Sequence, residues 1–224
     1  MFQTPGYSVG FDPKWRNQVV HNKAATGVSE VLGWSESFIE DFRQASFCGG
    51  TGVCRSPEKL RWKAPDRGFF KINTDAAIDT AGGRSGLGVI IRDCKGLVMA
   101  SACYGISASL QPQIAEAMAI FRGILLAFSS GLLPALLESD ALSVVNEINA
   151  KEPSFADVGV VVSDILGVLG GVRVLSVNFA PRDVNVVAHG LAKLALSYVG
   201  EWVWLEDCPL CVESLVLGDS LIAL

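Results

Sequence analysis

The order of hydrophobic periodicities constrains the fold of this 224-residue chain more than any other feature. Three short apolar segments come first in its main body, at residues 69–76, 86–92 and 97–106. Between the second and the third, Asp93-Cys-Lys-Gly96 has the composition of a turn. Strand-like segments that are joined by tight turns predict an antiparallel meander of three strands.

Strand and helix patterns alternate after the meander. Apolar residues recur at helical spacing over residues 111–129, and Gly131 then provides a helix stop. The later segments are a strand at 134–138, helices at 141–150 and 157–169, a strand at 173–180 and a helix at 185–198. This order predicts an α/β fold with a mixed five-stranded sheet, three antiparallel strands and then strand–helix units, flanked by helices.

The predicted sheet occupies only part of the chain. We interpret residues 1–60 as an N-terminal leader, with one helix at 28–45 and a flexible Gly-rich linker at 48–57. Residues 61–199 form the expected α/β domain. Residues 200–224 lack clear periodicity, and we interpret them as a C-terminal tail.

Composition excludes several classes of protein. Half of the residues are apolar and 18% are charged, which indicates a buried core rather than general disorder. The longest uncharged apolar stretch, residues 123–137, is too short and too interrupted for a membrane span. Because the N-terminus lacks the pattern of a secretion signal, we expect an intracellular protein of the nucleus or cytoplasm, without a membrane partner. The sequence does not determine the oligomeric state, and a monomer is assumed.

Six cysteines are too few for a disulfide scaffold in a chain of this length, so we expect reduced thiols. Cys208 and Cys211 have the spacing of half a zinc site. The other half would have to come from Cys48 and Cys54, whose spacing is loose. Structural zinc is therefore the lesser alternative.

Charge leaves the partner open. The net charge of −5 does not favour a nucleic-acid-binding protein, because phosphate neutralisation requires Lys and Arg. Basic residues nevertheless cluster around the first strands: Arg61, Lys63, Arg67, Lys71, Arg84, Arg92 and Lys95. Solvated surface charge and a track for phosphates both explain this run.

Three acidic residues lie within or beside the apolar segments. Asp75 belongs to the first strand, Glu116 to the beginning of the first long helix, and Asp140 follows the fourth strand. A buried charge is costly unless it is paired or metal-bound. Taken singly, Asp140 would also suit a helix N-cap, and Glu116 would suit the helix dipole. Because strand ends and helix starts gather at one edge of such a sheet, we expect the three carboxylates to meet.

A cluster of carboxylates has a specific chemistry. Two hard divalent cations about 4 Å apart, held by carboxylates, promote phosphodiester hydrolysis, and Mg²⁺ prefers oxygen ligands. The sequence has no Walker loop, no Gly-x-Ser-x-Gly elbow and no His-Glu-x-x-His helix. A mechanism based on a protein nucleophile is therefore poorly supported.

Five blocks of sequence resemble a known family. The strand Lys71-Ile-Asn-Thr-Asp-Ala-Ala77 resembles the opening of ribonuclease H type 1 domains, in particular their plant reverse-transcriptase-like, retroelement-derived branch. The other blocks follow in the family's order at residues 86–93, 115–117, 138–141 and 182–193. The similarity covers about residues 62–197.

The resemblance implies a function and a set of site residues. Asp75, Glu116 and Asp140 would be ligands of two Mg²⁺ ions, with Mn²⁺ as the alternative. With His189 they would form the catalytic site of an endonuclease that hydrolyses the RNA strand of RNA–DNA hybrids.

Two departures from the family pattern affect this expectation. First, His189 stands where the family has its fourth carboxylate, and it would be either a metal ligand or a polar residue that binds no metal. Second, the loop at 179–185 lacks the histidine that many family members have there. A catalytically weak or inactive retroelement-derived nucleic-acid-binding module is therefore the alternative. A protein-interaction domain without a nucleic-acid role is the third hypothesis.

Overall fold

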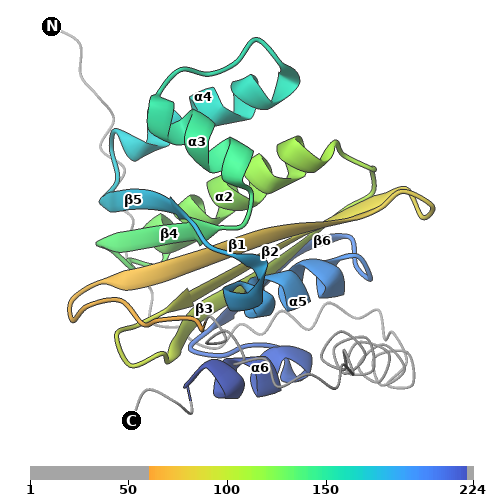
Figure 1. The fold of residues 1–224 in the computed structure, drawn as a ribbon. Helices are drawn as coiled ribbons and strands as arrows, with labels where there is room; N and C mark the ends of the chain where they lie inside the picture. The colour runs from red at the N-terminus through yellow and green to blue at the C-terminus, as the bar shows by residue number, and fades with distance from the viewer. Residues whose placement is uncertain (1–60, 221–224) are drawn as a thin grey trace, which may run out of the picture.

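The computed structural model describes residues 61–220, which form a mixed sheet with helices on both faces (Figure 1). The strands are β1 (Phe70–Asp79), β2 (Arg84–Arg92), β3 (Val98–Ile106), β4 (Ala135–Ser139), β5 (Val174–Phe179) and β6 (Gly200–Leu205). Their order across the sheet is β5-β4-β1-β2-β3-β6. The pairs β1–β2, β2–β3 and β3–β6 are antiparallel, whereas β4 is parallel to both β1 and β5. The predicted meander and the mixed α/β architecture are confirmed.

The predicted number of strands was one too low. Strand β6 lies in the segment that we interpreted as a tail, and it pairs with β3 along residues 100–105. Trp202 and Trp204 pack in a cluster on one face, whereas Val203 packs against the core on the other. Because both faces of the strand bear large apolar residues, it lacks the polar alternation that reveals a half-buried strand.

One face of the sheet carries α2 (Pro112–Ser129), α3 (Leu142–Ala150) and α4 (Asp157–Leu169) (Figure 1). Pro112 begins α2 at a position where its missing N–H costs nothing. The helix lies close to β1 because Gly123 has no side chain, and a Cβ there would be 2.8 Å from Thr74 Cγ2. This close packing fixes the height of α2 above β1.

The opposite face carries α5 (Val186–Ala195) and α6 (Leu210–Ser220) (Figure 1). Gly86 and Gly88 of β2 allow the backbone of α5 to lie directly on the sheet. A Cβ at Gly88 would overlap the carbonyl oxygen of Ala188 and the amide nitrogen of Ala192. Since Gly88 is the register partner of Asp75, this contact places the first turns of α5 beside Asp75.

Two members of the basic run form buried ion pairs. Arg92 is 1% exposed, and its Nη1 lies 2.7 Å from Asp219 Oδ2 of α6. Lys71 Nζ lies 2.6 Å from Glu138 Oε1. For these two residues both sequence-based interpretations, solvated charge and phosphate track, were wrong. Arg61, Lys63, Arg67, Arg84 and Lys95 are exposed.

Several predictions fall outside the described residues, namely the leader helix at 28–45, the linker, Cys48 and Cys54. Across residues 61–220, no helix combines the length and the apolar character that crossing a bilayer requires. Cys208 and Cys211 are free thiols, and they belong to no potential metal-binding group found in that range.

Candidate metal centre

The parallel ladder between β1 and β4 ends at the register pair Thr74↔Ser139. Asp75 is the next residue of β1, and Asp140 is the first residue after β4, so their carboxyl groups emerge side by side where the pairing stops. Asp75 lies in the middle of β1, opposite Gly88 on its other side. The end of a strand pair within a mixed sheet is a common position for a binding site.

Glu116 reaches the same place from α2. The Ala76 backbone amide forms a hydrogen bond with its carboxylate. One ligand oxygen from each of Asp75, Glu116 and Asp140 lies within 4.8 Å of the other two. The structure therefore brings together the three acids that the sequence singles out. We call these three residues the acid cluster.

The structure does not support the alternative interpretations of Asp140 as a helix N-cap and of Glu116 as a partner of the helix dipole. Helix α3 has Ala141 as its N-cap and no side-chain capping bond, so Asp140 is not that cap. The first turn of α2 contains no acidic residue, so Glu116 lies beyond the part of the helix where the dipole acts strongly.

Crowding raises the pKa values of the acid cluster. Burial and the charges of Asp75 and Asp140 raise the pKa of Glu116 to about 9. Burial and the charge of Asp75 raise the pKa of Asp140 to about 6, and a hydrogen bond between these two carboxyl groups contributes. Without a cation, Glu116 therefore retains its proton at neutral pH. A divalent cation would favour the ionised forms.

The acid cluster fits a hard divalent cation. Glu116 Oε2 is buried, and it has no hydrogen-bond partner among the described residues. A buried oxygen without a partner is costly unless another group satisfies it. Because all three side chains offer oxygen atoms, the donor set suits Mg²⁺ or Mn²⁺ better than a thiophilic metal.

His189 of α5 contacts the acid cluster through one member. Its Nδ1 lies 2.6 Å from Asp75 Oδ2, and its side chain is 18% exposed. His189 is absent from the group of three whose oxygens converge. The structure thus places His189 as a hydrogen-bond partner of Asp75, and a role in catalysis stays a prediction.

Two further residues border the acid cluster, and neither was predicted from the sequence. Asn185 Nδ2 donates to the Thr74 carbonyl at 2.9 Å and to Asp140 Oδ1 at 3.4 Å. Arg182 Nη2 lies 3.4 Å from both ring nitrogens of His189, and its charge lowers the pKa values of Glu116 and Asp140. Both residues belong to the block at 182–193, but periodicity could not predict the direction of side chains in the preceding loop.

The profile of the reverse transcriptase-like family matches residues 73–195, which is more than half of the chain. A curated Arabidopsis thaliana protein, whose name proposes a ribonuclease H, is 25% identical over 213 residues. The match covers 93% of this chain but 34% of the relative, so the chain spans about a third of that protein's length.

Solved structures share the fold at low sequence identity. The N-terminal RNase H domain of a Mycobacterium tuberculosis protein has a TM-score of 0.52 at 20% identity, covering 58% of this chain and 94% of that one. RNase H1 of Halobacterium salinarum has a TM-score of 0.51 at 21% identity, with 58% and 98% covered. LC11-RNase H1, solved with an RNA/DNA hybrid, has a TM-score of 0.51 at 21% identity, with 57% and 96% covered. The chain belongs to the reverse transcriptase-like family, and its domain has the RNase H fold.

Proposed function

We propose that this protein is a metal-dependent endonuclease that hydrolyses the RNA strand of RNA–DNA hybrids. The convergence of Asp75, Glu116 and Asp140 at the end of the β1–β4 ladder carries this proposal. Two comparisons support it, since a structure with the same fold holds an RNA/DNA hybrid and the Arabidopsis relative is named for ribonuclease H.

The acid cluster would hold the metal, with Asp75, Glu116 and Asp140 as ligands of two Mg²⁺ ions and Mn²⁺ as the alternative. Bound metal would lower the pKa of a water that attacks the phosphodiester and would stabilise the leaving oxygen. The oxygen ligands and the raised pKa of Glu116 support this assignment, because burial and the charges of Asp75 and Asp140 raise this pKa and a bound cation would offset both effects.

The chain's own residues would prepare the site. His189 holds one oxygen of Asp75, and Asn185 connects Asp140 to the backbone of β1, so both carboxylates have a defined orientation. Glu116 completes the set from the other face of the sheet. Arg182 adds a positive charge beside the three acids, which favours the approach of a phosphate. Selection of RNA over DNA would require contacts to the 2′-hydroxyl group.

A binding module with little turnover is the second candidate function. The contact between His189 Nδ1 and Asp75 Oδ2 favours it, because this contact occupies one oxygen of a proposed ligand. Imidazole is also a poorer ligand than carboxylate for Mg²⁺. Such a module would bind the hybrid through the same surface without efficient hydrolysis.

A panel of substrates tests the proposal. The purified full chain is incubated in Mg²⁺ or Mn²⁺ with end-labelled RNA–DNA hybrid, double-stranded RNA, double-stranded DNA and single-stranded RNA. We expect cleavage of the RNA strand of the hybrid alone. Hybrid binding without cleavage would favour the second candidate. An absence of both binding and cleavage would refute both candidates.

A further inference from the structure

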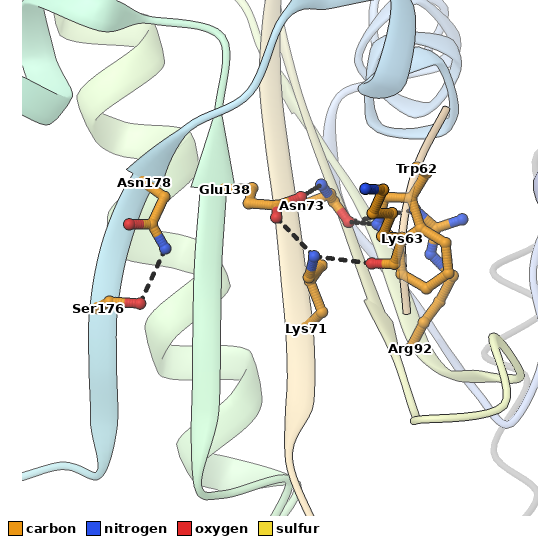
Figure 2. Close-up of polar contacts among 8 residues, drawn as sticks. All are labelled: Trp62, Lys63, Lys71, Asn73, Arg92, Glu138, Ser176 and Asn178. Atoms are coloured by element: carbon orange, nitrogen blue, oxygen red, sulfur yellow. Dashed lines mark hydrogen bonds and ion pairs between the residues drawn. The ribbon is translucent and has the colours of Figure 1, made fainter. Parts of the chain in front are cut away.

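Trp62 lies just before the residues that match the family profile, yet it is buried against β1 and β2. Its Nε1 donates to Asn73 Oδ1 at 2.9 Å, and the Arg92 guanidinium lies 3.5 Å from the centre of its ring (Figure 2). Asn73 occupies the same face of β1 as Asp75, two residues away. Trp62 is therefore fixed to the strand that carries the acid cluster.

Asn73 joins Trp62 to a polar network across three strands. Its Nδ2 donates to Glu138 Oε2 at 3.1 Å, and Arg92 Nη2 donates to its Oδ1 at 3.1 Å (Figure 2). Glu138 also accepts from Lys71 Nζ, which donates in addition to the Lys63 carbonyl at 2.7 Å. The backbone that follows Trp62 is thus attached, through Lys71, to β1 and β4.

The other side of Trp62 contacts the loop between β5 and α5. Trp62, Ala180 and Val184 form a small apolar cluster that is separate from the two larger ones, and Ala64 packs against it. Val184 belongs to the 3-10 helix η2 (Arg182–Val184). The chain from η2 into α5 carries Arg182, Asn185 and His189, the three side chains that border the acid cluster.

We infer that Trp62 is a positioning residue, which holds the segment from Arg182 to His189 against β1 so that Asn185 meets Asp140 and His189 meets Asp75. The Trp62 side chain is the apolar bridge between this segment and the network on β1. An effect of Trp62 on catalysis rests on the proposed function. Its effect on the position of residues 182–189 is independent of that function. An ordinary core tryptophan would support stability without a preferential effect on the acid cluster.

The test compares variants of the full chain. Trp62→Phe keeps an aromatic ring over Arg92 and against Val184 while it removes the Nε1 donor, and Trp62→Ala removes both. Trp204→Ala is the matched control, because Trp204 is half-buried on β6, three strands away from β1, and packs against the apolar cluster that contains Val187 and Ala188 of α5. Two quantities are measured for each variant: the affinity for Mn²⁺ by calorimetry, and the amide exchange rates of residues 184–189 in metal-free protein.

We expect Trp62→Ala to weaken Mn²⁺ binding about tenfold, as the loss of supporting contacts does in metal sites. Amide exchange at residues 184–189 should accelerate in the same variant. Trp62→Phe should bind Mn²⁺ within about threefold of the wild type. Trp204→Ala should leave the Mn²⁺ affinity unchanged and should accelerate exchange at residues 184–189 less than Trp62→Ala does, even where it lowers the unfolding temperature. Unchanged exchange in Trp62→Ala, or equal acceleration in Trp204→Ala, would overturn the inference. If the wild type binds no Mn²⁺, the proposed function fails, and the exchange rates alone then decide the role of Trp62.

Discussion

Asp75 is 2% exposed at the side chain, and its neighbours explain how the fold tolerates it. His189 contacts one of its oxygens, and Asp140 shares a hydrogen bond with it. Glu116 is the third acid, with a buried oxygen that has no partner among the described residues. Such a concentration of carboxyl groups costs stability unless a cation compensates their charge, which is the role of the metal in the proposed function.

At the residue scale, the pKa of Glu116 predicts how stability depends on pH. Its value of about 9 in the folded protein exceeds the ordinary value of 4.5, so the folded state retains a proton that the unfolded state has lost. The free energy of unfolding of metal-free protein should therefore fall as pH rises from 4.5 towards 9, by at most about 1.4 kcal/mol per pH unit for this proton. Asp140 contributes in the same direction between 3.8 and about 6.

Glu116→Gln is the variant that checks this dependence, because Gln stays neutral throughout. Urea denaturation of metal-free protein across this pH range should show a flatter profile for the variant, and a higher stability than the wild type at the alkaline end. Parallel profiles would mean that Glu116 is not the group with the raised pKa.

His189 offers a second prediction at this scale. In His189→Asp, a carboxylate replaces the imidazole beside Asp75 and adds an oxygen donor to the acid cluster. We expect affinity for Mn²⁺ to rise about tenfold, while the metal-free variant becomes less stable because a fourth acid adds repulsion. Calorimetry and thermal unfolding measure the two effects. A variant with weaker Mn²⁺ binding would contradict the assignment, with His189→Asn as the uncharged control.

At the scale of elements, glycines set the position of the helices that carry the site. Gly123 brings α2 against β1, and Gly88 brings the start of α5 beside Asp75. The site therefore depends on two close helix–sheet contacts, one on each face. A shift of either helix would separate Glu116 or His189 from the residues on β1.

Gly88→Ala tests the contact on the α5 face. The added Cβ would meet the backbone of Ala188 and Ala192, so α5 must move away from the sheet. We expect a loss of about 1–3 kcal/mol in the free energy of unfolding, together with weaker Mn²⁺ binding because His189 moves. Gly167→Ala in α4 is the control, since a Cβ there meets nothing within 4 Å and should stabilise the helix by about 0.5–1 kcal/mol. Equal effects of the two substitutions would argue against this role of Gly88.

At the scale of the whole molecule, the polar network connects distant parts of the chain. The ion pair of Arg92 with Asp219 attaches α6 to β2, and Trp62 attaches the N-terminal end of the described region to the same arginine. Both ends of the described range therefore meet on one face of the sheet. The overall charge of −5 is compatible with a nucleic-acid role only through local features such as Arg182 beside the acid cluster.

Much of this architecture could be predicted from the sequence. The meander and the strand–helix units follow from periodicity and turn composition, and the three acids could be selected because charge is rare in apolar segments. Strand β6 could not be predicted, because Trp202, Val203 and Trp204 place apolar side chains on both of its faces. The burial of Lys71 and Arg92 was also hidden, because their partners Glu138 and Asp219 are 67 and 127 residues away in the chain.

The borders of the acid cluster were similarly hidden. Asn185 and Arg182 come from the segment between β5 and α5, whose direction depends on contacts with distant residues, such as Val184 with Trp62 and Asn185 with Thr74. His189 could be identified as unusual by its place in the sequence block. Its contact with Asp75, in contrast, depends on how closely α5 approaches Gly88, and neither residue indicates this by itself.

The rate of RNA-strand cleavage in an RNA–DNA hybrid tests the central claim most directly, when it is measured against Mn²⁺ or Mg²⁺ concentration for the wild type and Asp75→Asn. We predict saturable, metal-dependent cleavage by the wild type, its loss on chelation, and a rate at least about a hundredfold lower in Asp75→Asn, because a ligand of the metal is lost. Thermal unfolding of both proteins confirms that they are folded. Cleavage that persists in Asp75→Asn, or that does not depend on a divalent metal, would contradict the account.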